Sequence, residues 1–333
     1  MNDKMSNELV SVKNVSVEFD YQDNFLSRKQ KIQAVKNVNL SIKKGSFVGL
    51  VGESGSGKTT LGRAILAANK ITEGQVIFHD EKKDYDLGSI SKKELKEYRK
   101  LSQLIFQDPY AALSPRMTVR DILAEPLEVM KITKTRAETD DRVREIASKC
   151  RLNLEHLRRF PHAFSGGQRQ RISIARALVS NPKFIVADES VAALDVSIQA
   201  DILNLLKNLQ KELNLTYLFI SHDLSVVAHI CDEVAVMYLG RIVEHGPTRE
   251  LFSNPKHPYT KALLSSIPSI DPEKQNKAIE LKGEIPSSMK PPSGCVFHTR
   301  CNYANENCKK EIPLLNTEIK KDHLVSCIRV NDI

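Results

Sequence analysis

Two groups of residues in this chain have the types and spacing for chemistry on phosphates. In the string GESGSGKTT, Gly52, Gly57, Lys58 and Thr59 fit the pattern G-x-x-x-x-G-K-[ST]. Glycines let main-chain N–H groups curl around phosphates, the lysine reaches the β- and γ-phosphates, and the threonine hydroxyl can ligate Mg²⁺. An apolar stretch precedes the string and the helical stretch TLGRAILAA follows it. This context favours a phosphate loop over an ordinary Gly-rich turn.

A pair of carboxylates follows a second apolar stretch. The residues from Phe184 to Ala187 are apolar and lead into Asp188 and Glu189. Ligands of open α/β sheets bind at the carboxyl ends of the strands, where these acids are expected to lie. Alone, the pattern also fits a plain strand end. Beside a phosphate loop it predicts phosphoryl transfer, with Asp188 holding Mg²⁺ through water and Glu189 polarising the attacking water.

Strands and helices must position the phosphate loop and the two carboxylates. Residues 8–50 alternate apolar and polar positions, as β-strands do, and a region of about 91–165 has charged segments of helical period interrupted by prolines. Beyond it strands and helices alternate, which predicts a parallel sheet covered by helices. From about 254 the chain is richer in Pro and Cys. We therefore expect an α/β fold in which residues 1–253 hold the helical insertion and residues 254–333 form a C-terminal extension.

Further strings connect these features to a known family. In FSGGQRQRISIARAL, Ser165 is placed to cap a helix whose N-terminus is open to an anion. SGGQ resembles the signature of the ATP-binding cassette (ABC) family. LIFQDP with Gln107 resembles its Q-loop, AALD with Asp195 its D-loop, and FISHD with His222 its switch histidine. Each string alone also fits an ordinary loop or cap, so the resemblance depends on their number and order.

The resemblance implies a P-loop NTPase (RecA-like) domain with an antiparallel β subdomain, a helical subdomain and a C-terminal extension. It also implies ATP hydrolysis, with Glu189, His222 and Gln107 as catalytic residues, and Mg²⁺ held by Thr59, Gln107 and Asp188. Phe19 stands where the family offers an aromatic ring to adenine, although a core position in its strand is the alternative. The implied nucleotide-binding set is Phe19, Gly52, Ser54, Gly55, Gly57, Lys58, Thr59, Thr60, Asp188, Ser165, Gly166, Gly167, Gln168 and Asp195.

The strings NPKHPYTKALL and EIPSSMKPPSGCVFHTRC resemble the ATP-binding subunits of dipeptide and oligopeptide importers, and the early segment is more similar to the F-type subunit. In this family two cassettes close head to tail, so one chain cannot form a whole site. The implied partners are a D-type ATPase or a second copy, two transmembrane permeases and an extracytoplasmic substrate-binding protein. The implied location is the cytoplasmic face of the cell membrane, as a peripheral protein. Nickel, metal-chelate or other small-ligand importers are the alternative, because similar ATPases serve them.

The chain departs from the family pattern at two positions. Ser190 stands where the family commonly has Pro, and Ala192 where the D-loop usually has Ser. Neither change removes a catalytic group. Both concern communication across the pair of cassettes.

Four of the six cysteines, Cys295, Cys301, Cys308 and Cys327, lie in the C-terminal extension. In a reducing cytosol such clustering favours a metal or iron–sulfur site over disulfides. Some peptide-importer ATPases carry a [4Fe–4S] cluster in this region, and the pattern here is similar. Zinc, with His298 or His323 as a further ligand, and free thiols remain open.

The composition limits the other functions. The 333 residues carry a net charge of +8, which gives some support to a soluble ABC ATPase acting on nucleic acid. Such proteins usually have paired cassettes or long coiled-coil insertions, which this sequence lacks, so we expect no nucleic-acid partner. The first twenty residues do not read as a secretory signal, and no apolar stretch is long enough for a membrane helix.

Overall fold

A computed structural model describes residues 7–22, 30–267, 278–315, 317–320 and 322–333. The chain forms two compact units. Of the described residues, unit 1 comprises 7–9, 43–46 and 89–220, and unit 2 comprises 10–22, 30–42, 47–88, 221–267, 278–315, 317–320 and 322–333.

Three strands of unit 1 run parallel to one another. β7 (Phe184–Asp188) pairs with β6 (Ser102–Ile105) on one side and with β8 (Thr216–Ile220) on the other. Every residue of β7 and β8 is buried. Strands covered on both faces consist of continuous apolar runs, which explains why these segments do not alternate.

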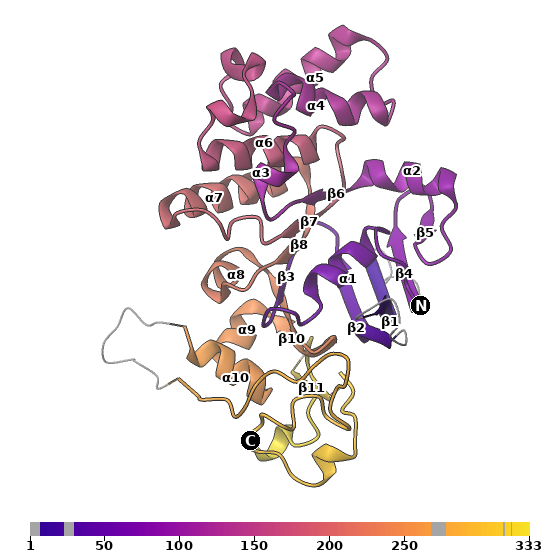
Figure 1. Cartoon of the computed structure of the whole chain (residues 1–333), viewed down its shortest axis with the longest axis vertical. Helices are drawn as coiled ribbons and strands as arrows, with labels where there is room; N and C mark the ends of the chain where they lie inside the picture. Colours follow the sequence, from indigo (N-terminus) through magenta and orange to yellow (C-terminus); the bar gives the residue numbers. More distant parts are fainter. Residues whose placement is uncertain (1–6, 23–29, 268–277, 316, 321) are drawn as a thin grey trace. The chain divides into compact units, whose positions relative to one another are not determined.

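Helices make up most of the rest of unit 1 (Figure 1). Thr118 and Thr135 cap α4 (Val119–Val129) and α5 (Arg136–Lys149) by accepting main-chain N–H groups, and α7 (Val196–Leu213) ends at Asn214 in the left-handed conformation. α4 packs against both α5 and α6. The helical elements are α2 (Lys92–Leu101), α3 (Pro109–Ala112), α4 (Val119–Val129), α5 (Arg136–Lys149), η1 (Leu154–Arg158), η2 (Pro161–Ala163), α6 (Gly166–Leu178) and α7 (Val196–Leu213).

Unit 2 contains a four-stranded sheet in the order β2-β1-β4-β5. β4 (Glu73–His79) pairs antiparallel with β1 (Glu8–Tyr21) and with β5 (Asp84–Asp86). β2 (Gln30–Lys43) forms the other edge. The expected antiparallel β subdomain is therefore confirmed.

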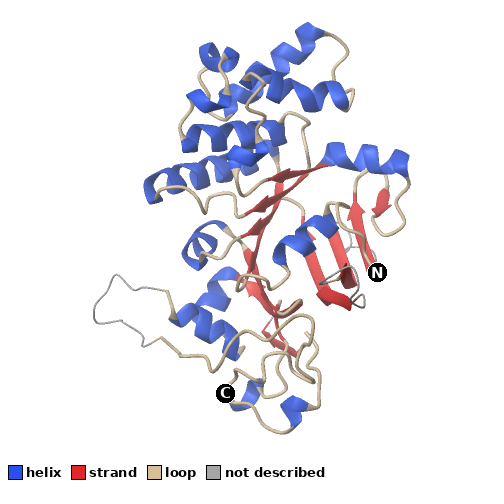
Figure 2. Cartoon of the chain, viewed as in Figure 1, coloured by secondary structure: helices blue, strands red, loops and turns tan. Residues whose placement is uncertain are grey.

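Unit 2 also contains a mixed set of strands, drawn in red with the others in Figure 2. β9 (Glu233–Tyr238) pairs parallel with β3 (Phe47–Val51) and antiparallel with β10 (Arg241–Pro247). β10 pairs in turn with β12 (His323–Val325), and β12 pairs with β11 (Thr317–Lys320). The strands are β3 (Phe47–Val51), β9 (Glu233–Tyr238), β10 (Arg241–Pro247), β11 (Thr317–Lys320) and β12 (His323–Val325); the helices are α1 (Lys58–Ile65), α8 (Leu224–Ile230), α9 (Thr248–Ser253), α10 (Pro258–Ser265), η4 (Asn307–Lys309) and η5 (Val330–Asp332). The mixed α/β architecture expected from the sequence is confirmed.

A buried carboxylate joins three segments of unit 2. Glu244 on β10 is fully buried and accepts the main-chain N–H groups of Lys256 at 2.8 Å and His257 at 2.9 Å. Nε2 of His323, on β12, lies 2.8 Å from its carboxylate. Burial disfavours the charged form, but hydrogen bonds from His323, Thr260 and the two N–H groups hold the pKa of Glu244 below its usual value.

Candidate functional site

The loop between β3 and α1 encloses a lysine. Lys58 is 5% exposed, and its Nζ donates hydrogen bonds to the carbonyl oxygens of Gly52 at 2.8 Å and Glu53 at 2.9 Å. The ammonium group therefore lies within the curve of the loop. A positive charge in this position suits a phosphate ligand.

Two glycines permit the tight course of this loop. Gly57 has a φ of 104°, and a Cβ atom there would lie 2.3 Å from the carbonyl oxygen of Ala34. At Gly52 a Cβ atom would lie 2.1 Å from the carbonyl oxygen of Met237. Because both contacts are with main chain, neither position accepts a side chain without a backbone shift.

The N-terminus of α1 suits an anion. Among the described residues, no side chain caps this end, and its first turn contains no acidic residue. Thr59 and Thr60 place two half-buried hydroxyl groups there, whereas Ser54 and Gly55 are exposed. The main-chain N–H groups of a helix start, a lysine and hydroxyl oxygens fit a phosphate accompanied by Mg²⁺.

Unit 1 holds the predicted carboxylates. Asp188 is the last residue of β7 and is 8% exposed. Glu189 has a φ of 46°, which is uncommon for a residue with a side chain, and its N–H donates to the carbonyl oxygen of Ile220 at 2.9 Å. Nε2 of Gln107, which follows β6, donates to Oε2 of Glu189 at 2.7 Å. The structure thus brings two of the three predicted catalytic residues into contact.

The SGGQ string forms the start of α6. The Ser165 side chain accepts the N–H of Gln168, and the Gln168 side chain accepts the N–H of Ser165, so the predicted cap is present. Both side chains are exposed, and Gly166 is half-buried. A Cβ atom on Gly167 would lie 2.6 Å from Cγ2 of Ile198, so the glycine allows α6 and α7 to approach closely.

Most of the remaining predicted residues lie at the surface of their own unit. His222 and Asp195 are exposed, and so is Ala192. Phe19, on β1, is 41% exposed, so it is not a core residue of its strand. Ser190 differs from these, because it is 2% exposed and its hydroxyl has no hydrogen-bond partner among the described residues.

Two residues that contact the phosphate loop could not be found from local sequence patterns. The hydroxyl of Tyr259 accepts the N–H of Glu53 at 2.9 Å, and Nη1 of Arg300 donates to Oε2 of Glu53 at 2.8 Å. These partners lie 206 and 247 residues from Glu53 along the chain. No local pattern marks contacts over such separations.

The four C-terminal cysteines line one cavity of about 20 Å³. All are free thiols, and burial raises the pKa of Cys295 to about 11 and also raises the pKa values of Cys301 and Cys327. Within the described part of the chain, no three His, Cys, Asp or Glu side chains have an arrangement that could hold a metal ion. The expected iron–sulfur site is therefore without support in this arrangement.

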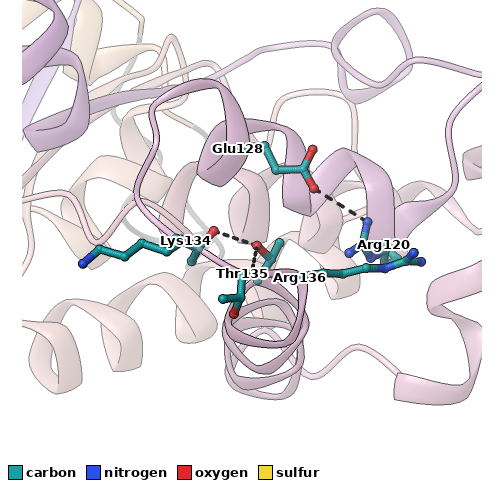
Figure 3. Close-up of a pocket in the computed structure, with 7 residues that line it drawn as sticks. Arg120, Glu128, Lys134, Thr135 and Arg136 are labelled. Carbon is teal, nitrogen blue, oxygen red and sulfur yellow. Dashed lines mark hydrogen bonds and ion pairs between the residues drawn. The ribbon is translucent and has the colours of Figure 1, made fainter.

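Two larger pockets lie in unit 1. The first, about 410 Å³ and lined by α4, α5 and the connection between them, is polar: Arg120 forms an ion pair there with Glu128 at 3.9 Å (Figure 3). Arg120 also pairs with Asp140 at 2.7 Å. The second is a groove of about 310 Å³ lined by Phe106, Val129 and Met130 among others. Phe106 is 41% and Val129 75% exposed, so this groove offers apolar surface to solvent.

No helix in the described ranges is both long enough and apolar enough to span a membrane.

The chain matches two sequence families. Residues 35–192 match the family described as ABC transporter, and residues 243–308 match the C-terminal region of the oligopeptide/dipeptide transporter family.

Its curated relatives are similar over nearly the full length. A putative peptide import ATP-binding protein of Brucella ovis is 50% identical, covering 92% of this chain and 95% of its own. The oligopeptide transport ATP-binding protein AppF of Bacillus subtilis is 48% identical over 96% of both chains. The oligopeptide transport ATP-binding protein OppF of Haemophilus influenzae is 46% identical over 97% of both.

Among solved structures, the dimeric ATP-binding cassette MJ0796 bound to ADP and Pi matches with a TM-score of 0.62 and 31% identity, over 72% of this chain and 99% of that one. The protein cbiO1 of Clostridium perfringens, part of the transporter complex cbiONQ, matches with a TM-score of 0.63 and 28% identity, over 75% and 92%.

Proposed function

This chain belongs to the ATP-binding proteins of ABC transporters, and from that membership we propose that its ATP hydrolysis powers the import of dipeptides or oligopeptides. The observation that carries the proposal is the extent of the similarity. Relatives named for peptide transport match both the cassette and the C-terminal region.

In the proposed site the phosphate loop binds the triphosphate. Lys58 would bind the β- and γ-phosphates, and the N–H groups at the start of α1 would donate to their oxygens. Mg²⁺ prefers oxygen ligands, and the Thr59 hydroxyl, the Asp188 carboxylate and the Gln107 side-chain oxygen would supply them. When bound, Mg²⁺ neutralises phosphate charge. Phe19 is proposed to stack on adenine, and its exposed ring supports this role.

Hydrolysis is assigned to three side chains. Glu189 orients the attacking water and accepts its proton, because a carboxylate at this position can act as general base. Gln107 holds the Glu189 carboxylate until nucleotide arrives, which its 2.7 Å hydrogen bond supports. His222 contacts the γ-phosphate.

The remaining predicted residues act on a second cassette. Ser165, Gly166, Gly167 and Gln168 would bind the nucleotide held by the partner, and their exposure at the start of α6 supports this assignment. Asp195 would contact the partner's site. The partner is proposed to be a D-type ATPase or a second copy of this chain.

The apolar groove beside Phe106 and Val129 is the proposed docking surface for a permease subunit. It is exposed, and Phe106 directly precedes Gln107, so a bound segment would adjoin the residue that holds Glu189. We propose that two permeases anchor the chain at the cytoplasmic face of the membrane and that an extracytoplasmic binding protein delivers the cargo.

The test is ATP turnover and uptake by the assembled complex in membrane vesicles. The vesicles receive a binding protein loaded with a dipeptide, a longer peptide or nickel. Peptide-stimulated hydrolysis with peptide accumulation supports the proposal and identifies the cargo length. Stimulation by nickel alone favours the metal importer, and stimulation only by nucleic acid rejects the transporter role.

The iron–sulfur cluster stays a prediction. Four thiols around one cavity favour it, but the side chains as described would have to rearrange to bind iron. Iron, sulfide and zinc contents of anaerobically purified full-length chain, with a Cys301→Ser/Cys308→Ser variant as control, decide among a cluster, zinc and free thiols.

A further inference from the structure

Three segments of unit 2 meet at one residue of the phosphate loop. The N–H of Glu53 donates to the Tyr259 hydroxyl at 2.9 Å, its carboxylate accepts from Arg300 at 2.8 Å, and its carbonyl oxygen accepts from Lys58 at 2.9 Å. The main chain and side chain of Glu53 are therefore both fixed.

Because Glu53 carries a negative charge, these contacts affect the binding of a triphosphate. A carboxylate in a loop that receives a triphosphate opposes binding unless it is compensated. The Arg300 side chain is 9% exposed and that of Glu53 is 24% exposed, so water screens their ion pair only in part. Arg300 thus both neutralises Glu53 and holds its side chain.

The two partners of Glu53 come from one packed cluster. Tyr259 lies in the first turn of α10, and Phe297, which is 1% exposed, places its ring 5.4 Å from that of Tyr259. The N–H of Arg300 in turn donates to the carbonyl oxygen of Phe297 at 3.0 Å. Burial raises the pKa of Tyr259, so its hydroxyl stays neutral.

We propose that Arg300 and Tyr259 are positioning residues for ATP binding: the C-terminal region fixes Glu53, and through it the carbonyl groups that hold Lys58. This inference rests on the proposed ATPase function. It adds to that function that residues outside the phosphate loop determine the affinity of the loop for nucleotide.

The experiment measures the dissociation constant for ATP of the purified full-length chain. Arg300→Gln is expected to raise it about tenfold, since one uncompensated charge then acts on the phosphates. Because the double variant Glu53→Gln/Arg300→Gln removes that charge, it should return to within about threefold of the wild type. A merely structural role of Arg300 predicts no such rescue, so equal weakening of both variants would overturn the proposal.

Two further variants provide a second test and a control for the same measurement. Tyr259→Phe removes a single oxygen and leaves the Glu53 N–H without its acceptor, so faster hydrogen exchange of the loop amides and weaker ATP binding are expected. Lys309→Gln removes an exposed ion pair of the same region and should match the wild type. If Arg300→Gln and Tyr259→Phe both bind ATP with wild-type affinity, the inference is rejected and the proposed function is unaffected. If the wild-type chain itself fails to bind ATP, the proposed function is rejected.

Discussion

The side-chain amide of Gln107 donates a 2.7 Å hydrogen bond to the carboxylate of Glu189. This contact joins the end of β6 to the end of β7, and it engages the group proposed to orient water. If Glu189 is the base, this hydrogen bond must break or shift before the carboxylate can accept a proton from water.

The first prediction concerns Glu189. Glu189→Gln is expected to leave ATP affinity near the wild-type value and to slow hydrolysis by about 10²–10⁴-fold, because an amide cannot accept the proton of the attacking water. Single-turnover hydrolysis in the assembled complex measures this effect. Glu145→Gln, which removes an exposed carboxylate paired with Arg142, is the control. Unchanged turnover in Glu189→Gln would remove this residue from the mechanism.

The second prediction concerns Lys58. Lys58→Ala removes the charge held by the Gly52 and Glu53 carbonyl groups, so ATP affinity should fall by about tenfold or more. Isothermal titration calorimetry with the full-length chain measures it. Lys44→Ala, at an exposed turn before β3, should bind ATP normally. If both variants bind alike, the phosphate-loop assignment fails.

The third prediction is a pH dependence of stability. Burial, opposed in part by the nearby Glu244, lowers the pKa of His257 from 6.5 to about 4. The unfolded chain therefore binds a proton that the folded chain does not, and stability should fall by up to about 3 kcal/mol as pH drops from 6.5 to 4. Glu244, with a lowered pKa, contributes a further loss only below about 4.5.

Thermal denaturation at a series of pH values tests the His257 effect. His257→Asn retains an acceptor for the Tyr259 N–H but has no proton to gain, so its pH slope should be shallower above pH 4.5. If the stability of the wild type and of His257→Asn falls equally with decreasing pH, the prediction is wrong.

The fourth prediction concerns the apolar groove. Val129→Asp places a charge in this exposed surface and should abolish co-purification with the permeases, because a charge in an apolar interface is costly to desolvate. The isolated variant should keep the wild-type denaturation midpoint. Leu314→Asp, also exposed but outside the groove, is the control. Intact assembly of the Val129 variant would place permease docking elsewhere.

The fifth prediction concerns Ser190. Its buried hydroxyl has no partner in the described part of the chain, so Ser190→Ala should raise the free energy of unfolding by about 1 kcal/mol. The matched control is Ser102→Ala, because the buried Ser102 hydroxyl donates to the Tyr98 carbonyl oxygen at 3.2 Å and its loss should destabilise. Destabilisation by both changes would mean that the Ser190 hydroxyl is satisfied in solution.

Much of the fold was predictable from local patterns. The phosphate loop and the acids at the end of β7 are continuous strings whose chemistry depends on neighbours in sequence, and the buried parallel strands consist mainly of apolar residues. Ser165 as a helix cap is likewise a local feature.

The rest depends on tertiary contacts. The Gln107–Glu189 hydrogen bond and the Arg300–Glu53 ion pair join residues far apart in the chain, so no spacing rule finds them. Phe19 was ambiguous because a strand residue can face either side, and only the folded β1 shows its exposure. The cysteines are a different case. They are clustered in the sequence and line one cavity in the structure, but clustering in the sequence does not determine whether their side chains have a metal-binding geometry.

The His323–Glu244 contact has a consequence for the order in which the protein is made. A ribosome releases β10 long before β12, so the nascent chain exposes the Glu244 carboxylate while its histidine partner is still unsynthesised. Unit 2 therefore cannot complete its interior until β12 has been synthesised. A chain that stops before β12 leaves the Glu244 charge short of a partner, so we expect this shortened product to be degraded rather than to work as a smaller ATPase.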